Sequence, residues 1–146
     1  MILEVERHVE SEPGRTWAVV GDVAGYAHHV KGLSESIVVA GTGPDQLRRC
    51  TDLRGRSWDE ACVAYEPGRL VSMQVDIASY PIDLRLMFRS FEGTWEVEPA
   101  GEGSTIRMRF TAEPRRGLGW LVNRLAARSR TDLEAILDSY EAALQE

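Results

Sequence analysis

The amino-acid sequence predicts an α+β fold in which one long C-terminal helix lies across a curved, seven-stranded antiparallel sheet. Residues 118–144 carry apolar side chains every three or four positions, which at about 100° per residue places them in one stripe along a helix. Residues 35–112 form six strand-like segments joined by short turns, and a first strand covers 2–10. Short connections leave no room for crossover helices, so neighbouring strands run antiparallel.

The N-terminal part of the chain predicts one strand followed by two short helices. Apolar and acidic residues alternate over 2–10, which is typical of a half-buried strand. Ser11 is the expected N-cap of the first helix, which carries Pro13 in its first turn and ends at Gly21. A second short helix is expected over 22–30, where Asp22 can cap its start.

The middle of the chain alternates strands with turn residues. In the strand that begins at residue 84, Leu84, Leu86 and Phe88 are expected to face inward and Arg85 to face solvent. Glycine and proline, with single aspartate and serine residues, occupy the connectors, as in hairpin loops. The six expected strands are 35–41, 46–53, 57–66, 69–77, 84–98 and 104–112.

The last stretch predicts a helix of about 26 residues, which spans roughly 40 Å. Such a helix with a one-sided apolar stripe is not stable alone in water, so a broad surface must cover it. Because a helix touches a curved sheet along a line, we expect a cavity between the two. The stripe consists of Leu118, Leu121, Val122, Leu125, Ser129, Leu133, Ile136, Tyr140 and Ala143.

Length and charge limit the class of protein. The 146 residues, 43% hydrophobic and 27% charged, predict a single ordered domain over 1–146. A net charge of −6 argues against a general nucleic-acid binder. One stretch is nevertheless basic, with Glu113 as its only acid. It is either a solvated face balanced by the acids after Asp132 or a docking surface for an acidic partner, such as an acyl carrier protein. Its arginines are Arg107, Arg109, Arg115, Arg116, Arg124, Arg128 and Arg130.

Cysteine content and hydropathy predict a cytoplasmic location. Cys50 and Cys62 lie in different expected strands without metal-type spacing, so we expect neither a disulfide framework nor a metal site. The first ten residues lack the apolar core of a signal peptide, and no run approaches the ~18 apolar residues of a membrane span. The sequence does not distinguish a monomer from a homodimer.

Several short motifs support a family resemblance that covers essentially the whole chain. They are D-V-A-G-Y at 22–26, G-R-S-W at 55–58, W-E-V-E-P at 95–99, G-S-T at 103–105 and R-T-D-L-E at 130–134. With the element order, they resemble the helix-grip (Bet v 1-like, SRPBCC) superfamily, which includes START domains, plant pollen allergens and bacterial polyketide cyclase/dehydrases. Within it, the chain looks most like the polyketide aromatase/cyclase branch.

The resemblance implies a hydrophobic pocket between the sheet and the long helix, opened near the two short helices. Tyr26 and Trp58 fall where the cyclases carry pocket aromatics. Four positions depart from the aromatase pattern, which uses Tyr, Arg, Gln and Asn at the places of Leu33, Ala64, Met108 and Ala126. These missing polar side chains matter because folding a poly-β-keto chain needs donors that polarise its carbonyls.

Glu60 is the first candidate catalytic residue. Trp58, Glu60 and Cys62 share one face of strand 57–66. If that face points into the cavity, desolvation raises the pKa of the carboxyl group toward the range useful for general acid–base catalysis. The alternative is that Ala61, Val63 and Tyr65 face inward and that Glu60 is solvated.

His29 is the second candidate, with His28 beside it near the expected pocket mouth. An imidazole with a pKa near ~6.5 can take an α-proton from a ketone. The alternative is that both histidines are ordinary surface residues on a short helix. A metal site built from these histidines and Glu60 is a poor hypothesis because the spacing is not that of metal ligands.

Methionine and aromatic side chains offer an adaptable apolar lining, although such residues also build ordinary cores. No phosphate-binding loop or G-x-S-x-G motif is present, so neither a nucleotide cofactor nor covalent catalysis is expected. We therefore expect binding of a hydrophobic, aromatic or polyketide-like molecule, with either cofactor-free cyclase/dehydratase activity or a non-catalytic carrier or sensor role. The candidate ligand-binding residues are Tyr26, Leu33, Trp58, Cys62, Met73, Phe88, Met108, Phe110, Leu121 and Leu125.

Overall fold

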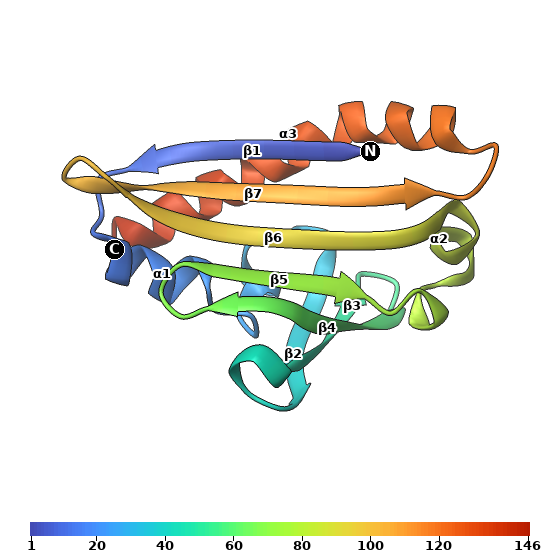
Figure 1. Cartoon of the computed structure of the whole chain (residues 1–146), viewed down its shortest axis with the longest axis horizontal. Coiled ribbons are helices and arrows are strands. Elements are labelled where there is room, and N and C mark those ends of the chain that lie inside the picture. The colour runs from blue at the N-terminus through green and yellow to red at the C-terminus, as the bar shows by residue number, and fades with distance from the viewer.

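The computed structural model describes all residues from 1 to 146 and contains one seven-stranded sheet (Figure 1). The strands follow the order β1-β7-β6-β5-β4-β3-β2, and every neighbouring pair is antiparallel. The predicted seven-stranded antiparallel sheet is therefore confirmed. The strands are β1 (Ile2–Val9), β2 (Leu33–Ala40), β3 (Leu47–Asp52), β4 (Ser57–Glu66), β5 (Leu70–Val75), β6 (Phe88–Ala100) and β7 (Gly103–Pro114).

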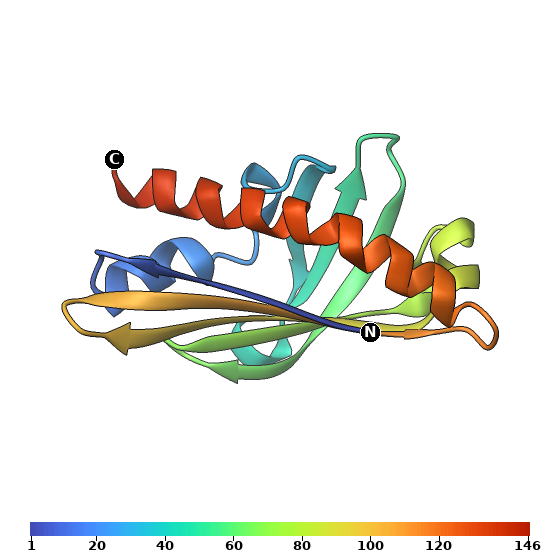
Figure 2. The ribbon, with the colours of Figure 1, turned by 90° about the horizontal axis from the view of Figure 1, so that it is seen from above.

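The helices pack against one side of this curved sheet. Figure 2 shows α3 running diagonally above the strands, with α1 and the segment that holds η1 on the same side. This arrangement confirms the predicted helix-grip fold with a long C-terminal helix. The helices are α1 (Pro13–Val20), η1 (Tyr26–His28), η2 (Gly43–Asp45), η3 (Ile77–Ser79), α2 (Ile82–Met87) and α3 (Gly119–Leu144).

The predicted strand 84–98 is wrong at its start, because residues 82–87 form helix α2. Pro81 precedes the helix with a φ of −51°, its carbonyl accepts a hydrogen bond from the Arg85 N–H at 2.9 Å, and Asp83 lies in the first turn. An acid there is favoured by the helix dipole. Leu86 is consequently 64% exposed instead of inward-facing, whereas Phe88 begins β6 and is buried as expected.

The first N-terminal helix differs from the prediction at its start, and the second is much shorter than predicted. The N-cap of α1 is Glu12 rather than Ser11. Ser11 is buried, and its carbonyl accepts a hydrogen bond from the Ser104 hydroxyl at 2.6 Å, which ties the chain to β7. The expected helix 22–30 is reduced to the short η1, although Asp22 still accepts a hydrogen bond from the Gly25 N–H at 3.1 Å.

Two buried clusters divide the core along α3. The larger one joins 18 buried residues from α1, the sheet and the C-terminal half of α3, including Leu137 and Tyr140. The smaller one consists of Phe88, Ala112 and Val122, under the N-terminal half of α3. Residues of both clusters line one of the cavities described below.

Candidate functional site

A buried ion pair between β3 and β4 is the most polar feature of the interior. Arg48 and Glu60 are direct cross-strand partners in the hairpin register, so both side chains lie on the inner face of the sheet. Arg48 Nη2 donates to Glu60 Oε1 at 2.7 Å. The two residues are only 2% and 7% exposed, so this is a desolvated pair rather than a surface contact. The structure therefore selects the first alternative for β4, with Glu60 inside.

Neighbouring groups complete the surroundings of the pair. Trp58 Nε1 donates to Glu60 Oε2 at 2.9 Å, so both carboxylate oxygens accept a hydrogen bond. Arg48 Nη1 donates to the Val23 carbonyl at 3.3 Å, and the guanidinium lies 4.7 Å from the ring centre of Tyr26. Arg48 Nε has no hydrogen-bond partner. The pair is thus held in one geometry, and one guanidinium nitrogen is left without any partner.

Burial changes the titration of the groups around the pair. Desolvation raises the pKa of the Cys50 thiol to about 12 and raises the pKa of the Tyr26 and Tyr80 phenols. For Arg48, burial acts to lower the pKa, but Glu60, together with Cys50 and Tyr26, outweighs burial and the pKa is raised. At neutral pH the two phenols are therefore neutral groups that can donate hydrogen bonds, and the guanidinium stays charged.

The pair forms part of the wall of a cavity of about 180 Å³, which we call the inner chamber. Apart from Arg48 and Glu60, its wall is almost entirely apolar, so a ligand there meets one polar spot in hydrophobic surroundings. The lining residues are Tyr26, Val30, Leu33, Arg48, Cys50, Trp58, Glu60, Met73, Val75, Tyr80, Phe91, Gly93, Trp95 and Phe110.

A second cavity of about 230 Å³, the helix chamber, lies between α3 and the sheet. It shares Tyr26, Val30, Phe91 and Phe110 with the inner chamber, so the two adjoin across these four side chains. The expectation of a cavity between helix and sheet is met. Its remaining lining residues are Met1, Leu3, Phe88, Val122, Leu125, Ala126, Ser129, Asp132, Leu133 and Ile136.

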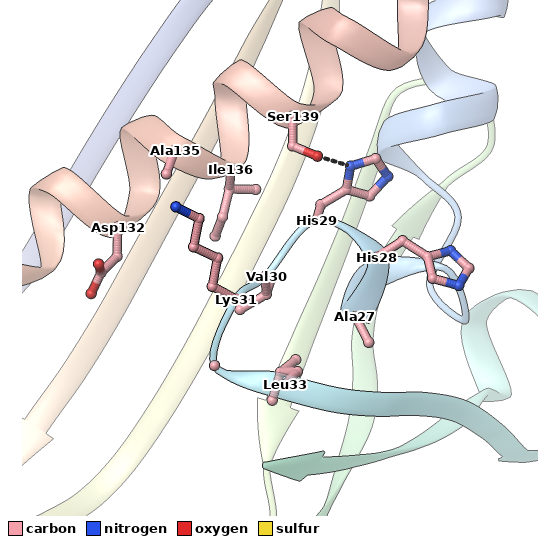
Figure 3. A pocket seen from close by; sticks show the side chains of 11 residues that line it. Ala27, His28, His29, Val30, Lys31, Leu33, Asp132, Ala135, Ile136 and Ser139 are labelled. Atoms are coloured by element: carbon pink, nitrogen blue, oxygen red, sulfur yellow. Dashed lines mark hydrogen bonds between the residues drawn. The ribbon is translucent and has the colours of Figure 1, made fainter. Parts of the chain in front are cut away.

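A groove of about 620 Å³, the outer groove, separates residues 27–33 from α3 (Figure 3). It shares Val30 and Leu33 with the inner chamber, and Val30, Asp132 and Ile136 with the helix chamber. The groove therefore leads from the surface to the residues that separate the chambers. Its other lining residues are Ala27, His28, His29, Lys31, Gly32, Ala135 and Ser139.

His29 holds one side of this groove against the helix. Its Nδ1 lies 2.7 Å from Ser139 Oγ, and its ring packs on that of Tyr140 with 4.6 Å between centres (Figure 3). Burial, and then the neighbouring His28, lower the pKa of His29. His28 is exposed and points away from α3. The structure contains no group of three His, Cys, Asp or Glu residues close enough to hold a metal ion.

The candidate residues from the sequence are distributed over these spaces. Glu60 lies in the inner chamber and His29 in the outer groove, so the two catalytic candidates do not form one cluster. Cys62, Met108 and Leu121 line none of the three spaces. The inner chamber is lined by Tyr26, Leu33, Trp58, Met73 and Phe110 from this set. The helix chamber is lined by Phe88 and Leu125, together with Tyr26 and Phe110.

Sequence reasoning missed Arg48, which stands in the strand segment Q-L-R-R-C-T-D-L. Hydrophobicity favours Leu47 as the inward residue there, yet Leu47 is 41% exposed and Arg48 is buried. The observed hairpin register places Arg48 opposite Glu60 on the same face of the sheet, whereas a register shifted by one residue would turn Leu47 or Arg49 inward instead. A buried carboxylate requires a partner, and the facing strand supplies it.

A long helix that grips a curved sheet over an apolar cavity defines the helix-grip class of cavity-forming proteins. The chain belongs to the family described as polyketide cyclase / dehydrase and lipid transport, whose sequence model matches residues 2–145. No curated protein matches the chain at a significant level.

Solved structures resemble this fold closely despite low sequence identity. ZhuI aromatase/cyclase from Streptomyces sp. R1128 has a TM-score of 0.79 at 14% identity, with 99% of this chain and 93% of that chain covered. The di-domain aromatase/cyclase BexL has a TM-score of 0.76 at 14% identity, with 100% and 50% covered. Norcoclaurine synthase from Thalictrum flavum has a TM-score of 0.75 at 16% identity, with 99% and 86% covered. At such identities the likeness establishes the fold alone.

Proposed function

We propose that the protein binds a hydrophobic, aromatic or polyketide-like small molecule in its two chambers and acts on it as a cofactor-free cyclase/dehydratase. The observation that carries this proposal is the Arg48–Glu60 pair in the wall of an otherwise apolar chamber. A buried pair is weak evidence for stability alone, because desolvation offsets much of its attraction. Placed against a cavity, the same pair supplies a donor and a proton acceptor to a ligand.

The proposed chemistry uses the pair for general acid–base catalysis. The Glu60 carboxylate takes a proton from a carbon between two carbonyls, and an N–H of Arg48 stabilises the resulting enolate oxygen. That carbon attacks another carbonyl of the same chain, and the new alkoxide recovers the proton from Glu60. A second abstraction by Glu60, with the proton passed to the departing hydroxyl, releases water.

The surroundings support this sequence of steps. Arg48 Nε is buried without a partner in the protein, so a carbonyl oxygen that reaches it as the neighbouring side chains move aside would satisfy its N–H. Each oxygen of Glu60 accepts one hydrogen bond and keeps a second lone pair that can take a proton from a ligand. The bond from Trp58 is the weaker of the two because its donor is neutral, whereas the bond from Arg48 joins two charged groups. His29 already contacts Ser139 and Tyr140, which favours a role at the entrance rather than beside Glu60.

Proton exchange on a simple diketone tests the proposal. Benzoylacetone serves as the probe, and NMR in deuterated water follows exchange of the proton between its carbonyls. Glu60→Gln keeps the side-chain shape, so we expect the protein-catalysed rate to fall about a hundredfold or more while probe affinity changes less than about tenfold. Asp59→Asn on the exposed side of the same strand is the matched control. An unchanged rate in Glu60→Gln removes Glu60 from the mechanism.

A carrier or sensor that does not transform its ligand is the second candidate function. It is favoured by the same geometry, because both oxygens of Glu60 are already engaged by Arg48 and Trp58. Native mass spectrometry of freshly purified protein identifies a co-purified ligand. A wild-type protein that binds benzoylacetone but exchanges its protons no faster than buffer supports the carrier role over catalysis.

A further inference from the structure

Four large apolar side chains project into solvent at one end of the molecule. Leu53, Ile82, Leu86 and Trp120 are 71%, 59%, 64% and 65% exposed, and we call this set the apolar end. The residues come from three separate segments: the β3–β4 turn, helix α2 and the first turn of α3. Single exposed apolar residues are ordinary, but four on adjoining segments suggest an interaction surface.

Direct contacts bring these three segments together. Arg56, after the β3–β4 turn, donates to Asp83 of α2 at 2.9 Å. The Arg115 N–H donates to the Met87 carbonyl at 2.9 Å, and Arg115 Nε donates to the Arg85 carbonyl at 3.1 Å, which fixes the segment before α3 beside α2. Figure 2 shows α2 next to the start of α3 at this end. The apolar end is therefore one region of the folded molecule.

Arginines without carboxylate partners surround this region. Arg54, Arg115, Arg116 and Arg124 form no ion pair, and they lie on the same segments as the apolar side chains. Arg107, at the opposite end of β7, contrasts with them because it contacts four carboxylates, Glu4, Glu6, Glu96 and Glu98. In a chain with a net charge of −6, these four arginines give this end uncompensated positive charge.

We propose that the apolar end docks on the surface of an anionic lipid bilayer. Apolar tips flanked by arginines fit such a surface, because the tips enter the interfacial layer while the cations meet anionic headgroups. A second copy of the chain is disfavoured, since it would bring like charges together. None of the helices is long and apolar enough to cross a membrane, so the contact is peripheral.

The position of the helix chamber suggests a functional role for this docking. Val122, in its wall, follows Trp120 by two residues, and Phe88 follows directly after α2. Docking would place the chamber next to the bilayer, so that an apolar ligand could move between lipid and protein with little exposure to water. This purpose rests on the proposed ligand binding, whereas the docking itself does not.

Vesicle co-sedimentation tests the docking with the full-length chain. The probes are vesicles of phosphatidylcholine alone and of phosphatidylcholine with phosphatidylglycerol at about three to one. We expect binding to the anionic vesicles that weakens as salt is added. Leu86→Ser combined with Trp120→Ser, and separately Arg115→Glu combined with Arg116→Glu, should each weaken binding about tenfold or more. Val63→Ser, an exposed apolar residue on β4, is the matched control and should bind like the wild type.

Three outcomes would overturn the docking proposal. They are absence of wild-type binding to anionic vesicles, equal binding by the Leu86/Trp120 variant, and binding of an acidic acyl carrier protein at this end without any vesicle binding. Benzoylacetone affinity in vesicle-free solution is measured in parallel. Because the apolar-end variants leave the inner chamber intact, retained affinity there separates a failure of docking from a failure of the proposed function.

Discussion

The two halves of α3 share one amphipathic pattern, but one half packs into the core and the other covers a cavity. The C-terminal half buries Leu133, Ile136, Leu137, Tyr140 and Leu144 against the larger core. The N-terminal half has only one buried residue, Val122, and its other inward side chains cover the helix chamber. A regular stripe therefore tells which side of a helix faces the sheet, but not whether that side meets packed core or empty space.

Truncating one leucine in each half of α3 should give the largest difference, measured as the loss in free energy of unfolding. Leu137 is fully buried, so Leu137→Ala is expected to lower the free energy of unfolding by ~2–5 kcal/mol. Leu125 lines the helix chamber and is only half-buried, so Leu125→Ala is expected to lower it by about 1 kcal/mol or less. Urea unfolding of both variants measures the difference. Equal losses would show that the two halves are packed alike.

Filling the helix chamber tests whether the N-terminal half of α3 covers space that a ligand occupies. Ala126 lines this chamber, so Ala126→Phe is expected to occupy its space and to weaken benzoylacetone binding on the order of tenfold. The neighbouring Ala127 is exposed, and Ala127→Phe is the matched control. Isothermal titration calorimetry gives both affinities. Unchanged affinity in Ala126→Phe would mean that the probe binds without using the helix chamber.

The smallest effect is expected at His29, which packs on the C-terminal half of α3. Burial lowers its pKa in the folded state, so the unfolded state binds more protons between that lowered pKa and about 6.5. Stability should therefore fall as the pH drops through this window. Urea midpoints at about pH 7.5 and pH 5 should differ less in His29→Asn than in the wild type. His28→Asn serves as control, and an equal pH dependence in the wild type and His29→Asn would contradict the assignment.

Strong periodicity explains which parts of the fold were predictable. The period-two strands and the long helical stripe repeat over many residues, so the sheet and α3 could be read from the sequence. Helix α2 could not, because Leu84, Arg85 and Leu86 alternate as a strand would, and six residues are too few to reveal a helical period. A proline and an early acid were the only local signs of this helix.

The candidate site was predictable only where one strand determined it. The face shared by Trp58 and Glu60 followed from strand spacing, whereas the presence of Arg48 depends on pairing between two strands. The contact of His29 with Ser139 joins residues 110 positions apart and has no local signature. Long-range register and loop docking therefore account for what the sequence left open.

The charges along α3 have a consequence for how the molecule moves toward a surface. Arg124 and Arg128 lie in its first half and Glu134, Asp138 and Glu141 in its second, so the side chains add to the backbone dipole instead of opposing it. The helix gives up some intrinsic stability for this arrangement. In return the helix carries a larger electric moment, part of which Arg7 offsets through its contacts with the three acids. The field of a negatively charged surface would exert a torque on this moment that turns the arginine end forward before any contact is made.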